Sequence, residues 1–106
     1  MSGTVWHDAL PLAALPPVCL RAVTIGEREI VLVRTAAGVF ALDNLCTHAE
    51  ARMCEGYLRG NRLVCPLHGG AYDVRTGGVL AAPCLAPLAI YPVRVADGRI
   101  EVGVTG

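Results

Sequence analysis

The chain contains 106 residues with a mass of 11.1 kDa, and 54% of its residues are hydrophobic and 17% are charged. This size and composition fit one compact domain spanning residues 1–106 and leave no room for a second. Nine arginines balance nine acidic residues, so the sequence lacks the excess positive charge that favours binding to nucleic acid or to an anionic membrane.

From the sequence we expect neither a signal peptide nor a membrane span. Residues 1–8 lack the basic and apolar regions of a signal peptide, and charged residues interrupt every apolar run before it reaches the length of a spanning helix. We therefore expect a cytoplasmic protein. Residues 8–15 carry the best helical pattern, but Pro11 interrupts it and Pro16 ends it.

The next part of the chain predicts β-strands. Short runs rich in β-branched and apolar residues cover residues 19–25, 28–35 and 39–43, with turn residues between them. Residues 30–33 are apolar at every position, which is typical of a strand covered on both faces.

The C-terminal part predicts a β-hairpin. Residues 89–95 and 99–104 read as strands, and the Asp97-Gly98 pair between them is a strong signal for a two-residue hairpin turn. Because no segment keeps a helical period over a dozen positions, we predict an all-β fold.

The cysteines and histidines indicate a metal site. Five cysteines cannot all pair within one chain, and in a reducing compartment cysteines near histidines are more often metal ligands than bridges. Two of the three histidines lie beside cysteines, in Cys46-Thr47-His48 and in Cys65-Pro66-Leu67-His68. Between these two boxes, Asn61 marks a turn that can bring them together. The remaining cysteines, which we place outside the ligand set, are Cys19, Cys54 and Cys84.

Two thiolates and two imidazoles suit either a tetrahedral zinc site or a two-iron cluster in which histidines replace two of the cysteines. Donor chemistry alone leaves both open. In this chain each box offers one sulfur and one nitrogen, whereas common zinc modules keep two cysteines on one arm and two histidines on the other.

The paired boxes Cys46-x-His48 and Cys65-Pro66-x-His68-Gly69, separated by residues 49–64, resemble the ligand boxes of Rieske iron–sulfur proteins. The resemblance continues through residues 70–78 and through the proline-bearing loop 81–88. It implies a Rieske-type antiparallel β-sandwich, with a small loop-rich cluster-binding subdomain over about residues 44–86 inserted between the outer strands. It also implies a single [2Fe–2S] cluster, with one iron held by Cys46 and Cys65 and the other held through Nδ1 of His48 and His68.

The residues around the boxes depart from the respiratory members of that family. The positions of their disulfide cysteines are Ala51 and Leu67 here, and a serine that donates a hydrogen bond to a bridging sulfide is replaced by Gly70. Tyr72 matches a tyrosine that bonds a ligand sulfur, although it could equally be a packed aromatic whose hydroxyl meets solvent. The loss of the serine and the disulfide predicts a reduction potential toward the low end of the Rieske range.

Small and rigid residues complete the expected surroundings of the cluster. Gly69 and Gly70 can bring backbone N–H groups close to sulfur, Gly77-Gly78 can reverse the chain, and Pro83 can stiffen a third loop over the cluster.

The chain has no nucleotide-binding motif and no second metal constellation for substrate oxidation. The resemblance therefore implies an electron carrier rather than an enzyme, similar to the ferredoxin component of bacterial ring-hydroxylating dioxygenase systems. Its partners would be an NAD(P)H-dependent flavin reductase and a terminal oxygenase. Three alternatives remain: a Rieske-like small subunit of a nitrite reductase or other oxidoreductase complex, a structural zinc module, and a disulfide-stapled binding domain without metal.

Overall fold

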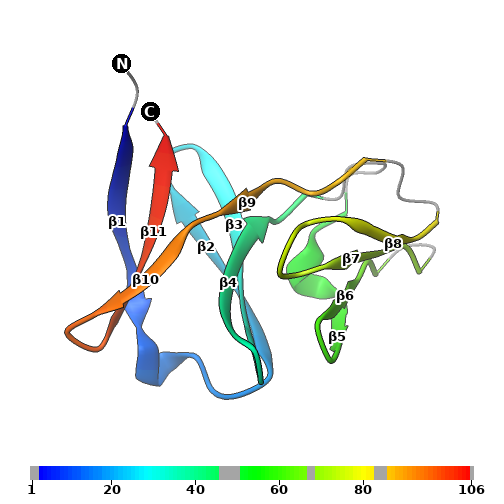
Figure 1. Ribbon diagram of the computed structural model, residues 1–106, viewed down its shortest axis with the longest axis horizontal. Coiled ribbons are helices and arrows are strands. Elements are labelled where there is room, and N and C mark those ends of the chain that lie inside the picture. Colours follow the sequence, from blue (N-terminus) through cyan, green and yellow to red (C-terminus); the bar gives the residue numbers. More distant parts are fainter. Residues whose placement is uncertain (1–2, 46–50, 67–68, 83–85, 106) are drawn as a thin grey trace.

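The computed structural model describes residues 3–45, 51–66, 69–82 and 86–105, and these residues form eleven β-strands and two short 3-10 helices (Figure 1). The helices are η1 (Leu12–Ala14) and η2 (Met53–Glu55). The strands are β1 (Thr4–Pro11), β2 (Cys19–Ile25), β3 (Arg28–Thr35), β4 (Gly38–Asp43), β5 (Tyr57–Arg59), β6 (Arg62–Val64), β7 (Ala71–Asp73), β8 (Val79–Ala81), β9 (Ile90–Tyr91), β10 (Val93–Ala96) and β11 (Arg99–Thr105). The predicted all-β class is confirmed. Across the described ranges, no helix has the length and apolar character needed to cross a membrane.

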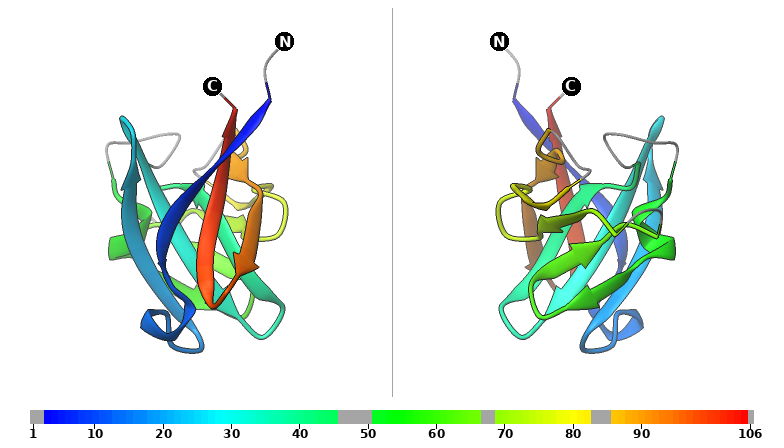
Figure 2. Two further views of the ribbon diagram at one scale, coloured as in Figure 1. Left: turned by 90° about the vertical axis from the view of Figure 1, so that its left-hand side faces the viewer. Right: turned by 90° about the vertical axis from the view of Figure 1, so that its right-hand side faces the viewer.

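The strands form three antiparallel sheets. The terminal sheet has the order β1-β11-β10, the central sheet has the order β2-β3-β4-β9, and the small sheet has the order β5-β6-β7-β8. Figure 1 shows the central sheet between the other two, and the two side views in Figure 2 show the same arrangement end-on. The terminal and central sheets make the expected sandwich.

The central sheet has an apolar core on each face, and β3 contributes to both. Val31 and Val33 point to the core shared with the small sheet, while Ile30 and Leu32 point to the core shared with the terminal sheet. All four side chains are fully buried. This confirms that residues 30–33 form a strand covered on both faces, and it explains why they show no alternation of apolar and polar residues.

The predicted C-terminal hairpin is confirmed. Strands β10 and β11 pair with Ala96 opposite Arg99, and the two turn residues between them, Asp97 and Gly98, have φ values of 52° and 74°. Two consecutive left-handed residues define a type I′ turn, whose twist matches that of the paired strands.

The predicted strand over residues 89–95 is wrong in one respect, because the structure divides it at Pro92. Strand β9 pairs with β4 in the central sheet, whereas β10 pairs with β11 in the terminal sheet. Proline has no N–H to donate to a ladder, but the Pro92 carbonyl still accepts a hydrogen bond from Gly103 N at 2.8 Å. The chain therefore changes sheets at Pro92.

The sequence patterns do not predict the N-terminal strand β1. It pairs with β11 along most of its length, from Thr4 opposite Thr105 to Pro11 opposite Arg99. A register shift between Asp8 and Leu10 marks a bulge in this pairing. The pattern in residues 8–15 resolves into the end of β1 and the single turn η1.

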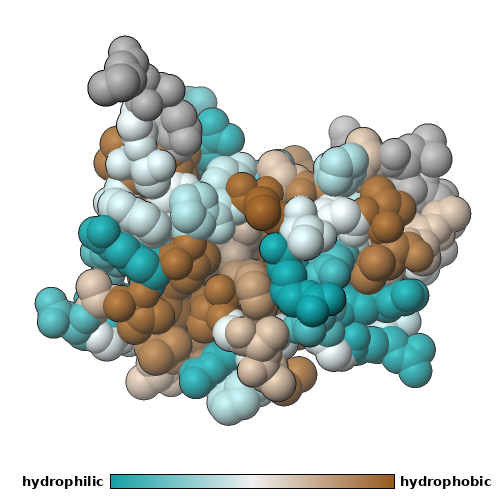
Figure 3. Space-filling view, viewed as in Figure 1, coloured by the Kyte–Doolittle hydropathy of each residue, from teal (hydrophilic) through white to brown (hydrophobic). Residues whose placement is uncertain are grey.

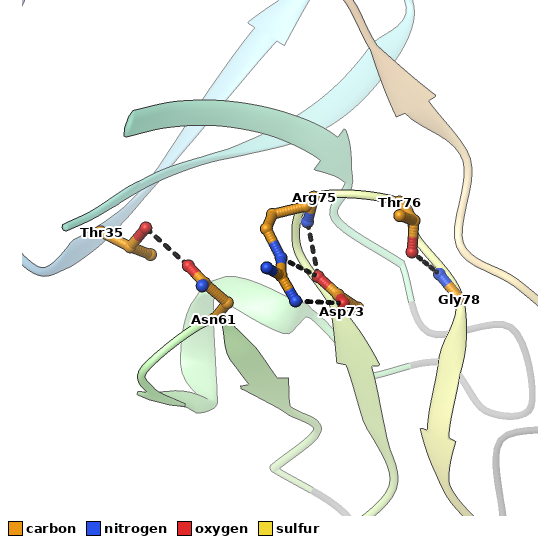
Figure 4. Close-up of polar contacts among 6 residues, drawn as sticks. All are labelled: Thr35, Asn61, Asp73, Arg75, Thr76 and Gly78. Atoms are coloured by element: carbon orange, nitrogen blue, oxygen red, sulfur yellow. Dashed lines mark hydrogen bonds and ion pairs between the residues drawn. The ribbon is translucent and has the colours of Figure 1, made fainter. Parts of the chain in front are cut away.

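The small sheet is fixed to the central sheet through the turn at Asn61, which confirms the turn predicted there. The Thr35 hydroxyl donates to Asn61 Oδ1 at 2.8 Å (Figure 4). Val74 N donates to the Asn61 carbonyl at 2.9 Å. Thr35 is 8% exposed, so its bond to Asn61 is a shielded contact between the end of β3 and the β5–β6 turn.

The β7–β8 turn is ordered by its own polar side chains. The Arg75 guanidinium forms a two-pronged ion pair with Asp73, with distances of 3.1 and 3.0 Å, and Gly78 N donates to the Thr76 hydroxyl at 3.1 Å (Figure 4). Hydrogen bonds from the side chain and backbone of Arg75 hold the pKa of Asp73 below its usual value. The predicted reversal at Gly77-Gly78 is confirmed, with Gly77 at a left-handed φ of 78°.

Candidate metal centre

Of the four predicted ligands, only Cys65 lies within the described residues. Cys46, His48 and His68 lie outside them, as does Pro83 of the third loop. Within the ranges that the structure covers, no three His, Cys, Asp or Glu side chains come together as a metal site. The ligand set therefore remains a prediction, and the described residues form the framework that carries it.

Cys65 follows directly after β6 and is 1% exposed. Its side chain belongs to the core between the small and central sheets, with Leu63 and Tyr72. Cys65 N donates to the Gly70 carbonyl at 2.7 Å, which closes the β6–β7 loop at its base. The second box thus begins on a buried, hydrogen-bonded residue at the end of a strand.

Gly69 and Gly70 lie on the returning side of that loop. Gly69 has a left-handed φ of 72°, with open space at the position of a Cβ atom. Glycine is therefore favoured at position 69 by the left-handed backbone conformation, and not by the close approach of any described atom. Gly70 is buried and can offer no hydroxyl, so the serine hydrogen bond of the respiratory proteins has no equivalent at this position.

Tyr72 is fully buried in the same core. The interpretation in which its hydroxyl meets solvent is therefore wrong, because no part of the side chain reaches the surface. Its role as a hydrogen-bond donor to a ligand sulfur stays a prediction.

The segment that carries the first box is also closed at its base. Leu45 and Arg52 form an antiparallel bridge, and Arg52 Nε pairs with Glu29 Oε1 at 3.0 Å. This ion pair ties the returning end of the segment to β3. Ala51, at that returning end, is 5% exposed.

A third closure holds the segment after β8. Leu88 N donates to the Gly77 carbonyl at 2.8 Å, and Asp43 N donates to the Ala89 carbonyl at 2.9 Å. Leu88 is 2% exposed and packs in the core. The chain therefore returns from the third loop onto the β7–β8 turn and the end of β4.

One core joins all three segments. Ala51, Cys65 and Leu88, which flank the three loops, belong to a single buried cluster together with Tyr72. A thiol in such an apolar, water-poor setting suits a sulfur-ligated metal cluster, since burial and hydrogen bonding around the sulfurs set its reduction potential. The described framework thus fits a Cys/His-bound cluster.

Sequence reasoning missed two contacts that hold this framework. One is the approach of Leu88 to Gly77, and the other is the pairing of the Asn44 side chain with Cys54. An Asn placed two residues before a predicted ligand, at the end of an apolar strand, was the available signal for the second contact. For the contact between Leu88 and Gly77, the nearest sequence signal was the Gly77-Gly78 pair.

Comparison with known proteins points to one family. A family model described as the Rieske [2Fe-2S] domain matches residues 5–92. The chain is 38% identical over 100 residues to the ferredoxin component of the naphthalene 1,2-dioxygenase system of Pseudomonas aeruginosa, and the alignment covers 94% of this chain and 96% of that relative.

Solved structures agree with this match. A chain in the complex of reduced oxygenase and oxidized ferredoxin in carbazole 1,9a-dioxygenase superposes with a TM-score of 0.88 at 32% identity, covering 94% of both chains. A Mycobacterium tuberculosis protein assigned as an NADH-dependent nitrite reductase small subunit superposes with a TM-score of 0.82 at 28% identity, covering 98% of both chains. The dioxygenase ferredoxins are the more similar of the two groups.

Proposed function

The chain belongs to the Rieske [2Fe–2S] family, and on this premise we propose that it is the ferredoxin component of a multicomponent oxygenase system. The observation that carries the proposal is the end-to-end match to a dioxygenase ferredoxin, which covers 94% of this chain and 96% of the relative. A carrier of that kind moves one electron at a time and has no substrate-oxidising site of its own. The nitrite reductase alternative is less supported, since the similarity to that group is lower.

The cofactor is a single Rieske-type [2Fe–2S] cluster. In our proposal Cys46 and Cys65 hold one iron, and His48 and His68 hold the other. Such a cluster accepts and releases one electron, and its two neutral imidazoles place its potential between about −150 and +300 mV, against roughly −400 mV for plant-type ferredoxins. Cys65 is 1% exposed and lies in an apolar core, so in our proposal this ligand sulfur is shielded from water.

The fold supports an inserted cluster-binding subdomain over about residues 44–86 within one domain of residues 1–106. The chain leaves the central sheet after β4, forms the small sheet, and returns to pair with β4 through β9. The expected cytoplasmic location stays part of the proposal, supported by the similarity to dioxygenase ferredoxin components.

Two partners follow from this function. The first is a terminal oxygenase, supported by the likeness to the ferredoxin seen with its oxygenase. The second is an NAD(P)H-dependent flavin reductase, which would supply the electron.

Exposed apolar side chains lie near the first box and on β8. Leu45, next to the first box, is 49% exposed, and Leu80, on β8, is 45% exposed. Figure 3 shows hydrophobic surface over β8. Exposed apolar side chains of this kind suit the small, transient contacts of electron transfer.

The test begins with the wild-type chain purified without oxygen. We expect a red-brown protein that contains iron and sulfide in equal amounts and bleaches on reduction. Its reduced form should show the lowered average g value of mixed Cys/His ligation in electron paramagnetic resonance (EPR). Zinc without iron, or a metal-free chain with disulfides, would overturn the proposal in favour of the structural alternatives.

The electron route is tested in a second step. With NADH and the flavin reductase of a naphthalene-type system, the cluster should become reduced, and it should be reoxidised on rapid mixing with the matching terminal oxygenase. A cluster that exchanges electrons only with a nitrite reductase large subunit would favour the small-subunit alternative.

A further inference from the structure

Asn44 is an unusual residue in this fold, because its polar side chain is completely buried. Among the described residues, the buried polar side chains are Thr35, which is 8% exposed, and Asn44, which is 0% exposed. Asn44 follows β4 directly and lies two residues before the predicted ligand Cys46. A buried amide without partners costs about 1–3 kcal/mol, so its contacts show what keeps it there.

Among the residues that the structure describes, the Asn44 side chain bonds to Cys54. Its Oδ1 accepts a hydrogen bond from Cys54 N at 2.8 Å, and its Nδ2 donates to Cys54 Sγ at 3.4 Å. Sulfur is a weak acceptor, so the bond to Cys54 N is the stronger of the two.

The Asn44 backbone adds two further bonds. Asn44 N donates to the Glu29 carbonyl at 3.0 Å, and the Asn44 carbonyl accepts from Met53 N at 2.5 Å. Asn44 therefore joins three parts of the molecule: β3, the end of β4, and the 3-10 helix η2.

These contacts close the segment that carries the first box. Asn44 precedes that segment in the chain, and its partners Met53 and Cys54 follow it. The second box is closed differently, by the backbone bond from Cys65 N to the Gly70 carbonyl. A backbone bond tolerates most substitutions at its ends, whereas the closure of the first box depends in part on the identity of one side chain.

We propose that Asn44 is a positioning residue for the first ligand box, holding through Cys54 N the base of the segment that presents Cys46 and His48 to the cluster. The inference rests on the proposed function, since it assigns Asn44 a role toward the cluster. Residues that orient metal ligands in this way typically change metal affinity by about 10–100-fold when they are replaced.

The experiment compares four variants as the complete, cluster-loaded chain. Asn44→Ala removes both side-chain bonds, whereas Asn44→Asp keeps an oxygen that can accept from Cys54 N. Cys54→Ala removes only the sulfur acceptor and leaves the Cys54 N–H in place. Thr35→Val is the matched control, because it removes another shielded side-chain bond, the one to Asn61, which joins the end of β3 to the β5–β6 turn rather than the described residues on either side of the first box.

The measurements are the rate of cluster bleaching in air, the reduction potential and the EPR spectrum, with thermal unfolding recorded for each variant. We expect Asn44→Ala to bleach at least about tenfold faster than wild type and to show a broadened EPR spectrum. Asn44→Asp and Cys54→Ala should stay within about threefold of wild type. Thr35→Val should lower thermal stability without changing bleaching, potential or spectrum.

Two results would overturn the inference. One is an Asn44→Ala chain that loses stability like Thr35→Val but keeps a wild-type bleaching rate and spectrum. The other is an Asn44→Asp chain that bleaches as fast as Asn44→Ala, since the retained acceptor would then have no effect.

The inference can be tested even if Asn44→Ala does not fold. Hydrogen exchange at Cys54 N–H in the wild-type chain should be at least about tenfold slower than in an unstructured peptide of the same sequence, and unprotected exchange would overturn the closure itself. Failure of the proposed function is distinguishable, because in that case the wild-type chain would assemble no [2Fe–2S] cluster at all.

Discussion

Replacement of Gly77 by alanine should be strongly destabilising, for two separable reasons. Gly77 has a φ of 78°, and a Cβ atom there would lie 2.1 Å from the Leu88 carbonyl oxygen and 3.0 Å from Ile90 Cγ2. The left-handed conformation costs a residue with a Cβ about 1–2 kcal/mol. Relieving the overlap with a backbone atom costs about 1–3 kcal/mol more, so we expect Gly77→Ala to lose about 2–5 kcal/mol.

Gly60 provides the matched control. It has a left-handed φ of 61°, but no atom lies within 4 Å of the position of its Cβ. Gly60→Ala therefore carries only the conformational cost of about 1–2 kcal/mol.

The assay is urea unfolding of the anoxic, cluster-loaded chains followed by circular dichroism, together with thermal melting. A loss of 2 kcal/mol or more should lower Tm by at least about 8 °C in a domain of this size. If the two variants lose the same free energy within about 0.5 kcal/mol, the close approach of Leu88 to Gly77 does not exist in solution. The closure of the third loop by the hydrogen bond from Leu88 N to the Gly77 carbonyl would then be refuted with it.

Three further predictions concern stability and potential. Thr35→Val should lower the free energy of unfolding by about 1–2 kcal/mol, because Asn61 Oδ1 and Ala37 N lose their hydroxyl partner; urea unfolding at neutral pH measures this, and an unchanged midpoint would contradict it. Arg75 holds the pKa of Asp73 low, so their pair adds stability above the pKa of an unfolded Asp, about 3.9, and that stability disappears as the pH falls through the lower folded pKa. Between about pH 5 and pH 2, the free energy of unfolding should therefore fall less in Arg75→Gln than in the wild-type chain. Superimposable pH profiles of the two chains would rule out this contribution. Finally, a redox titration should place the potential toward the low end of the Rieske range, about −150 to +300 mV, and a value near the upper end would show that the missing serine and disulfide do not govern it.

Much of the fold could be predicted locally. The strands over residues 19–25 and 28–35 match β2 and β3 residue for residue, and residues 39–43 match β4 within one residue. The Asp97-Gly98 turn could also be predicted, because its left-handed φ values are a property of those two residues and their neighbours. The paired Cys and His boxes pointed to the family for the same reason, since their chemistry is carried by residues close together in the sequence.

Other features depend on partners far away in the chain. Strand β1 exists as part of a sheet because Thr4–Pro11 finds β11 at the other end of the chain, and its own residues carry no clear period. Pro92 interrupts what looked like one strand, but only the positions of β4 and β11 decide that its two halves join different sheets. A proline predicts an interruption of the hydrogen-bond ladder, but it does not predict which strand the following residues pair with.

The sequence by itself therefore determined the strand-rich class, the principal turns and the donor types of the metal centre, because each follows from short-range chemistry. Only the tertiary structure decided that Asn44 closes on Cys54 and Leu88 on Gly77, and that Ala51, Cys65 and Leu88 share one core. These contacts join residues that are 10 or more positions apart, and their formation is settled by how the sheets pack rather than by any pattern along the chain.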